Sequence, residues 1–284
     1  MNVLVTGATG FIGNYVIDEL LRQGHGVIAT SSSAQKAERF SWSKNVIYIP
    51  FNFSDFNATI NYYDFFKKPD LIIHLAWEGL PNYKEAFHLE INLPRQLAFL
   101  ENLLQNGLKD ITVTGTCFEY GMKEGCLTEE MACEPANAYA VAKNRLRREL
   151  QEISLRNPFH FKWVRLFYMF GKGQSPNSLF SLLDRALTNN ETIFNMSGGM
   201  QERDYLPVEL VAKNIVAIAL QNKVTGVINC CSGKPIAVKN MVQDYLNKKG
   251  KSIILNLGYY PYPDYEPMRF WGDTTKLKSI SGND

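Results

Sequence analysis

Residues 6–13 read TGATGFIG. They lie between a short β-branched run, Val3–Val5, and a stretch with apolar residues at helical spacing, Phe11–Gln23. The three glycines of this segment permit, in chain order, a tight turn, a close approach of the backbone to a pyrophosphate, and close packing of helix on strand. The N-terminus of the helix offers free N–H groups to an anion. The sequence therefore predicts a phosphate-binding turn at the start of the chain.

Strand-like and helical segments alternate outward from this turn. Strict alternation indicates an α/β protein with a doubly wound parallel sheet and right-handed crossovers, the Rossmann arrangement. Strands are expected at Val3–Val5, Val27–Thr30, Val46–Pro50, Asp70–Ala76, Ile111–Thr114, Phe161–Leu166 and Val227–Cys230. Helices are expected at Phe11–Gln23, Ala86–Asn106, Ala138–Leu155, Ser178–Thr188, Val208–Leu220 and Val238–Lys248. Residues 259–267 hold three prolines and four tyrosines and are expected to form an irregular covering loop.

Composition excludes several functional classes. The 284 residues include 30 Lys and Arg against 28 Asp and Glu, a net charge of +2, which is too balanced for a protein held on nucleic acid by a basic face. No stretch approaches the roughly 18 apolar residues of a membrane span, and no signal peptide is recognisable. Five cysteines without paired spacing and four scattered histidines argue against a disulfide framework and a metal site. We expect a cytoplasmic enzyme.

A tyrosine and a lysine four residues apart are the first catalytic candidates. Tyr139 and Lys143 lie on an expected helix, so their side chains share one face. An ammonium beside a phenol favours the phenolate and lowers the phenol pKa from its usual value of about 10. Tyr139 is therefore a candidate general acid and base for the interconversion of a hydroxyl and a ketone.

These motifs together resemble the short-chain dehydrogenase/reductase superfamily. More narrowly, they resemble its extended branch, the epimerase/dehydratase family, which acts on nucleotide sugars. Residues 114–121, TGTCFEYG, resemble the family's SS-x-x-x-YG segment. There a Ser or Thr four residues before the tyrosine hydrogen-bonds the reacting oxygen, which assigns that role to Thr116. The resemblance is collinear along the whole chain, and further matches lie at Leu75-Ala76-Trp77, Asn92, 165–171, 203–205, 229–233 and 273–276.

The resemblance implies a division of the chain. Residues 1–165 would form the dinucleotide-binding Rossmann domain, completed by about 205–232. Residues 166–204 and 233–284 would form a smaller substrate-binding lobe. Relatives generally form homodimers through two long helices, here Ala86–Asn106 and Ala138–Leu155.

The cofactor implied by the resemblance is a nicotinamide dinucleotide. The second expected strand runs into Ser31–Ser33, and no acidic residue appears before Glu38, whereas NAD enzymes of this fold place an acid there for the ribose 2′-hydroxyl. Lys36 and Arg39 lie just downstream and would suit a 2′-phosphate. We therefore favour NADP(H) over NAD(H), with the alternative that Ser31 leaves room for both. The expected cofactor-binding residues are Gly7, Thr9, Gly10, Phe11, Ile12, Gly13, Ser31, Ser32, Lys36, Asn52, Phe53, Leu75, Ala76, Trp77, Asn92, Thr114, Tyr139, Lys143, Leu166 and Phe167.

The expected substrate is a nucleotide sugar. Arg203 matches an arginine that commonly holds the diphosphate, and a guanidinium suits that group. Tyr168 stands where relatives have asparagine, and Cys117 is either a sugar contact or a small buried filler. The expected substrate-binding residues are Trp77, Thr116, Cys117, Tyr168, Asn177 and Arg203.

Three reactions share this scaffold. Dehydratases commonly carry an Asp–Glu pair after the catalytic threonine, and Cys117-Phe118 stand there instead. The short chain and GTCFEYG resemble reductases of nucleotide-linked 4-keto-6-deoxyhexoses. We expect NADPH-dependent reduction of the 4-keto group, with Tyr139 as proton donor, Lys143 holding the ribose and Thr116 orienting the carbonyl. The alternatives are a nucleotide-sugar 4-epimerase with tightly held NAD and, in another class, a catalytically silent cofactor-sensing regulator.

Overall fold

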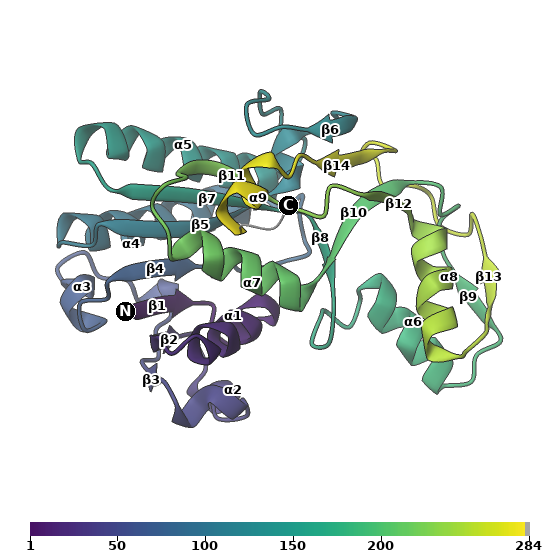
Figure 1. Ribbon diagram of the computed structural model, residues 1–284, viewed down its shortest axis with the longest axis horizontal. Helices are drawn as coiled ribbons and strands as arrows, with labels where there is room; N and C mark the ends of the chain where they lie inside the picture. The colour runs from purple at the N-terminus through teal and green to yellow at the C-terminus, as the bar shows by residue number, and fades with distance from the viewer. Residues whose placement is uncertain (282–284) are drawn as a thin grey trace.

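Seven parallel strands form the central sheet of the computed structural model, which describes residues 1–281 (Figure 1). The strand order β11-β7-β5-β4-β1-β2-β3 confirms the doubly wound α/β fold predicted from the alternation of segments. The strands are β1 (Asn2–Thr6), β2 (Gly26–Thr30), β3 (Ile47–Tyr48), β4 (Leu71–His74), β5 (Asp110–Thr116), β7 (His160–Leu166) and β11 (Gly226–Cys230).

Both faces of this sheet are covered. Val3 and Val5 of β1 belong to the core on one face, and Leu4 between them belongs to the core on the other, as the two-residue period of a strand requires. The helices α1 (Phe11–Arg22), α7 (Val208–Ala219) and α9 (Thr275–Ser281) contribute to the first core. The second core is built with α3 (Tyr62–Phe65), α4 (Leu93–Gln105) and α5 (Ala138–Arg156).

A smaller lobe lies beside the sheet, to the right in Figure 1. Its core is formed by the helices α6 (Leu179–Thr188) and α8 (Val238–Lys249) with small sheets. The strands of those sheets are β8 (Tyr168–Phe170), β9 (Ile193–Asn195), β10 (Glu202–Pro207), β12 (Pro235–Ala237) and β13 (Ile254–Asn256). Another two-stranded sheet pairs β6 (Gly125–Leu127) with β14 (Phe270–Gly272).

The end of the chain returns from the lobe to the large sheet. Helix α9 packs on α7 and β11, because Leu277 is buried in the first core. The division predicted from the sequence had placed this segment, as part of residues 233–284, in the substrate-binding lobe. No helix among the described residues is long and apolar enough to cross a membrane.

The expected helix at 86–106 begins differently from the prediction. Residues His88–Asn92 form a π-helical turn, and the regular helix α4 starts at Leu93. Pro94 has no N–H to donate to the carbonyl four residues earlier, which favours a widened turn at this point. Short helices at Ala34–Ala37 (α2), Ser41–Lys44, Phe53–Asp55 and Cys117–Tyr120 (η4) complete the described elements.

Gly13→Ala should destabilise the fold. A Cβ at this position would lie 2.2 Å from the carbonyl oxygen of Gly7, which is backbone and cannot move aside cheaply. We expect the free energy of unfolding, measured in urea, to fall by about 1–3 kcal/mol. Gly26→Ala is the control, because its Cβ would come too close only to the flexible side chain of Asn2, at 2.3 Å, and would meet backbone at an ordinary contact distance of 3.6 Å. Equal losses in the two variants would contradict the interpretation of the turn.

Candidate active site

A first cavity lies at the carboxyl ends of β1, β2 and β4. Eleven of the residues expected to bind the cofactor line it: Gly7, Thr9, Gly10, Ser31, Ser32, Lys36, Asn52, Phe53, Leu75, Ala76 and Trp77. Thr30, Phe51 and Glu78 complete the lining. Residues from four separate segments are thus brought together at one cavity, and no acidic residue stands at the end of β2.

The glycine turn in this cavity fits a dinucleotide. Gly7 has a φ of +69°, and a Cβ there would lie 3.0 Å from the backbone nitrogen of Ala76, so only glycine allows this approach. No side chain caps the N-terminus of α1 at Gly10, which leaves its first N–H groups available to a pyrophosphate. The Thr6 hydroxyl accepts the N–H groups of Leu75 and Ala76 at 3.2 and 3.3 Å and fixes the opposite wall.

A second cavity, of about 240 Å³, holds the catalytic candidates. Thr116 and Tyr139 line it together with Ile12, Leu166 and Phe167, which were expected to bind the cofactor. The rest of the lining is Leu80, Tyr83, Gly115, Cys117, Phe118, Tyr168, Met169 and Gln174. Five other expected cofactor residues line neither cavity: Phe11, Gly13, Asn92, Thr114 and Lys143.

The Thr116 hydroxyl is set to donate a hydrogen bond. Thr116 ends β5 and caps η4, and its Oγ1 accepts the N–H of Phe118 at 3.3 Å. That contact uses an oxygen lone pair and leaves the hydroxyl proton for a partner at the cavity, which in this structure is the Tyr139 side chain and which a substrate oxygen would replace. Thr116 can therefore polarise a carbonyl oxygen in the second cavity.

Lys143 is buried behind the two cavities. Its Nζ donates to the carbonyl oxygen of Thr114 at 2.8 Å and lies 4.2 Å from the centroid of the Trp77 ring. Burial lowers the pKa of Lys143 to about 7, and the charge of Glu119 opposes this shift. The Trp77 indole is in turn held by His88, since its Nε1–H donates to Nδ1 of that histidine at 3.0 Å.

The protein alone does not make Tyr139 acidic, contrary to the sequence interpretation. Burial raises the pKa of Tyr139 well above its usual value, and a hydrogen bond from Thr116 opposes this shift only in part. The ammonium of Lys143 is committed to Thr114 and Trp77 instead. Tyr139 is therefore a neutral phenol, which is the form that donates a proton. Its main-chain N–H donates to the carbonyl of Tyr83 at 3.0 Å, which fixes the start of α5.

A third cavity lies in the small lobe and shares Tyr168 with the second. Its lining is Tyr168, Leu179, Leu182, Phe194, Asn195, Met196, Ser197, Gln201, Arg203, Tyr205, Val238, Tyr260 and Glu266. Oε1 of Gln201 is buried there without a hydrogen-bond partner, and the buried hydroxyl of Tyr168 lies close to the Arg203–Glu266 pair. Those polar atoms make this cavity a candidate binding site for a polar ligand.

Arg203 is not the free cation that the sequence suggested. Its Nε and Nη2 donate to Oε2 of Glu266 at 3.1 and 2.9 Å, and its Nη1 donates to two carbonyl oxygens. Glu266 was missed because a single carboxylate in an irregular loop carries no motif. A diphosphate on Arg203 would have to displace this carboxylate.

The other expected substrate-binding residues differ in whether they line a cavity. Cys117 lines the second cavity, and burial raises the pKa of its thiol, so it is neutral. Asn177 is exposed and lines none of the three cavities, because it precedes the cap of α6 and lies at the surface. Gln174 and Tyr83 stand in the second cavity's wall and had no sequence motif. Asn92 donates to the carbonyl of Glu78 at 3.0 Å and so orders the segment that follows β4.

A model of the NAD dependent epimerase/dehydratase family matches residues 3–231. The chain belongs to this family. It is accordingly an NAD(P)-dependent oxidoreductase of the extended short-chain dehydrogenase/reductase type. No group of three or more His, Cys, Asp or Glu among residues 1–281 is arranged to hold a metal ion.

Known proteins are similar to the chain over most of its length. A dTDP-6-deoxy-L-talose 4-dehydrogenase (NAD(+)) from Aggregatibacter actinomycetemcomitans is 29% identical over 96% of this chain and 99% of its own. A UDP-glucose 4-epimerase from Mycolicibacterium smegmatis is 27% identical over 76% of this chain and 72% of its own. The solved structure of a UDP-N-acetylglucosamine 4-epimerase from Methanobrevibacter ruminantium superposes with a TM-score of 0.86 at 23% identity, over 99% of this chain and 91% of that one.

Lys143→Met should change how stability depends on pH. The pKa of Lys143 is about 7 in the fold, against 10.5 for an ordinary lysine. The unfolded chain therefore binds more protons between these values, and wild-type stability should rise with pH across this window by about 1.4 kcal/mol per pH unit from this group. The variant lacks that contribution, so the difference between the two proteins should change with pH in urea unfolding at pH 7, 8 and 9. The exposed Lys223→Met should follow wild type.

Proposed function

We propose that the protein reduces the 4-keto group of a nucleotide-linked 4-keto-6-deoxyhexose with a nicotinamide cofactor. One observation carries this proposal. A neutral, buried phenol and the threonine hydroxyl that hydrogen-bonds it line the same small cavity, beside a cavity that fits a dinucleotide. A carbonyl oxygen placed between these groups would meet one proton donor and one hydrogen-bond donor.

The chain's own residues have distinct parts in this reaction. The nicotinamide, when bound, supplies the hydride. The Tyr139 phenol gives its proton to the carbonyl oxygen while the carbonyl carbon accepts the hydride, so the ketone becomes a secondary alcohol. Thr116 donates a hydrogen bond to the same oxygen and stabilises the charge that develops there. Lys143 lies one helical turn from Tyr139 and beside Trp77, where its ammonium would hold the ribose of the bound cofactor.

The second cavity favours reduction over dehydration. Elimination of water needs additional acid and base groups beside the sugar, and the described residues that line this cavity include no carboxylate. The neutral thiol of Cys117 and the ring of Phe118 occupy the positions where such groups would stand. The lining suits a sugar that is reduced at one carbon and otherwise left intact.

The 4-dehydrogenase relative supports the same assignment. Its name describes oxidation at carbon 4 of a dTDP-linked 6-deoxyhexose, which is the reverse of the proposed reduction. Its alignment covers nearly all of both chains, so the small lobe is included in the match. We propose that the third cavity takes the nucleoside diphosphate part of the substrate, because it adjoins the catalytic cavity at Tyr168.

A nucleotide-sugar 4-epimerase is the second candidate. The relative from Mycolicibacterium smegmatis is an epimerase by name, and the fold is also that of a solved 4-epimerase. The same three residues would serve an epimerase, which oxidises and reduces one carbon in a single cycle. The two candidates therefore differ in the stoichiometry of cofactor use.

The choice between NADP(H) and NAD(H) has arguments on both sides. Ser31, Ser32 and Lys36 line the first cavity where a 2′-phosphate would lie, and the preference for NADP(H) stays a prediction from these residues. The name of the 4-dehydrogenase relative points to NAD instead. Dimerisation through α4 and α5 and a cytoplasmic location also stay predictions.

Comparing the affinity for NADPH with that for NADH in wild type and in Lys36→Ala tests the cofactor prediction, since only the affinity for NADPH should fall in the variant.

Tyr139→Phe and Thr116→Val should impair reduction to different extents. We expect wild type to oxidise one cofactor for each 4-keto sugar consumed, followed by absorbance at 340 nm with dTDP-, UDP-, GDP- and CDP-linked substrates. Loss of the proton donor should lower kcat by about 10²–10⁴-fold. Loss of one hydrogen-bond donor should cost about 10²-fold. Tyr245→Phe in the small lobe, which loses its bond to Asp184, is the matched control.

Product analysis by NMR separates the candidates. A carbon-4 epimer formed without net oxidation of added cofactor would identify an epimerase. If cells that carry Tyr139→Phe kept the full function of the protein, the catalytically silent cofactor-sensing regulator would be the better interpretation.

Glu266→Gln should strengthen diphosphate binding. The Glu266 carboxylate occupies Arg203, and it would repel a diphosphate placed nearby. Neutralising it should lower the Kd of dTDP at least threefold in calorimetric titrations. A weaker Kd in this variant would mean that Glu266 itself contacts the ligand.

A further inference from the structure

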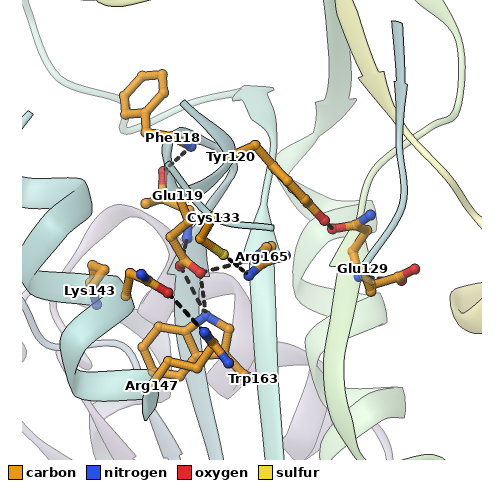
Figure 2. A network of polar contacts seen from close by, with 12 residues as sticks. Phe118, Glu119, Tyr120, Glu129, Cys133, Lys143, Arg147, Trp163 and Arg165 are labelled. Atoms are coloured by element: carbon orange, nitrogen blue, oxygen red, sulfur yellow. Dashed lines mark hydrogen bonds and ion pairs between the residues drawn. The ribbon is translucent and has the colours of Figure 1, made fainter. Parts of the chain in front are cut away.

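A carboxylate is completely buried directly behind the catalytic threonine. Glu119 lies on η4, three residues after Thr116, and none of its surface is exposed. Its Oε1 accepts the main-chain N–H of Thr116 at 2.9 Å and the indole N–H of Trp163 at 2.9 Å. Its Oε2 accepts Nε–H of Arg165 at 2.8 Å (Figure 2). The carboxylate therefore ties the end of β5 to its neighbour β7 at the edge where the catalytic cavity opens.

Gly115 makes room for this arrangement. A Cβ at Gly115 would lie 2.4 Å from Oε1 of Glu119 and 2.1 Å from Nε1 of Trp163. The glycine is therefore required by the close approach of the carboxylate and the indole. The segment 115–119, GTCFE, acts as one unit: the glycine admits the glutamate, and the glutamate holds the threonine.

Arg165 neutralises the charge of the Glu119 carboxylate. Its side chain is 1% exposed, and its guanidinium lies 4.3 Å from the centroid of the Tyr120 ring. Its Nη2 donates to the sulfur of Cys133 at 2.8 Å (Figure 2). Buried ion pairs are commonly neutral or unfavourable for stability compared with apolar residues of the same size. A role in stability alone is thus a weak reason for this pair to lie behind Thr116.

We propose that Glu119 is a positioning residue for the reaction: it holds the Thr116 main chain from inside the protein and so aims the threonine hydroxyl at the substrate oxygen. This inference rests on the proposed function of the same site. Glu119 lines neither cavity, and its direct contact with the catalytic groups is through Thr116. Its charge also opposes the effect of burial on the pKa of Lys143.

The double variant Glu119→Leu/Arg165→Met tests the proposal without leaving an unpaired buried charge. Replacing both partners by apolar residues keeps the volume and should preserve the fold, with a Tm somewhat below wild type because the N–H groups of Thr116 and Trp163 lose their acceptor. We expect kcat to fall by about 10–100-fold, since small displacements of a catalytic group are costly, while cofactor Kd and substrate KM change little. We also expect faster hydrogen exchange at the Thr116 amide in the free protein.

The matched control removes another buried ion pair that joins the same two strands. Asp110 and Lys162 pair at 2.7 Å. They lie toward the N-terminal ends of β5 and β7, whereas the cavities lie at the C-terminal ends of the strands. Asp110→Leu/Lys162→Met should leave kcat and the Thr116 amide unchanged.

The single variants separate geometry from charge. Glu119→Gln keeps an oxygen that can accept the Thr116 N–H, whereas Glu119→Leu does not. We expect glutamine to retain at least tenfold more kcat than leucine. Equal kcat in these two variants, a wild-type kcat in Glu119→Leu/Arg165→Met, or an unchanged exchange rate at Thr116 would each overturn the inference. Wild-type turnover reports separately on the proposed function, and the exchange measurement needs no substrate.

Discussion

The burial of both faces of the central sheet is the constraint on which the rest of the molecule depends. Every residue of β4 and β5 is buried, so neither face of these strands offers a surface for a ligand. Polar side chains with free hydrogen-bonding capacity can reach solvent only where the strands end. The glycine turn after β1, the serines after β2 and Thr116 at the end of β5 accordingly meet at one edge. In parallel sheets this carboxyl edge is where ligands generally bind.

Behind this edge the interior is more polar than a simple core would need. Lys143, Glu119 and Arg165 are all nearly or fully buried, and each makes specific hydrogen bonds within the protein. The resulting network fixes side chains in one arrangement at a cost in desolvation. We interpret the fixed arrangement as a preorganised site, in which the catalytic groups need little rearrangement when substrate binds.

Much of the fold and site could be predicted from the sequence because the deciding signals are local. The spacing of Tyr139 and Lys143 follows from the helical repeat, and the glycines at 7, 10 and 13 follow from steric limits at one turn. Contacts between distant segments carry no such signal. The pairing of Arg203 with Glu266 joins residues 63 positions apart through an irregular loop, and the pKa of Tyr139 depends on burial that only the folded chain creates.

Tyr168 forms part of the wall of both the catalytic cavity and the small-lobe cavity. Under the proposed assignment of these cavities, a substitution at this ring would alter recognition of the sugar and of the attached nucleotide together. The two parts of substrate specificity would then be coupled through one side chain, so that neither could be changed at this position without affecting the other.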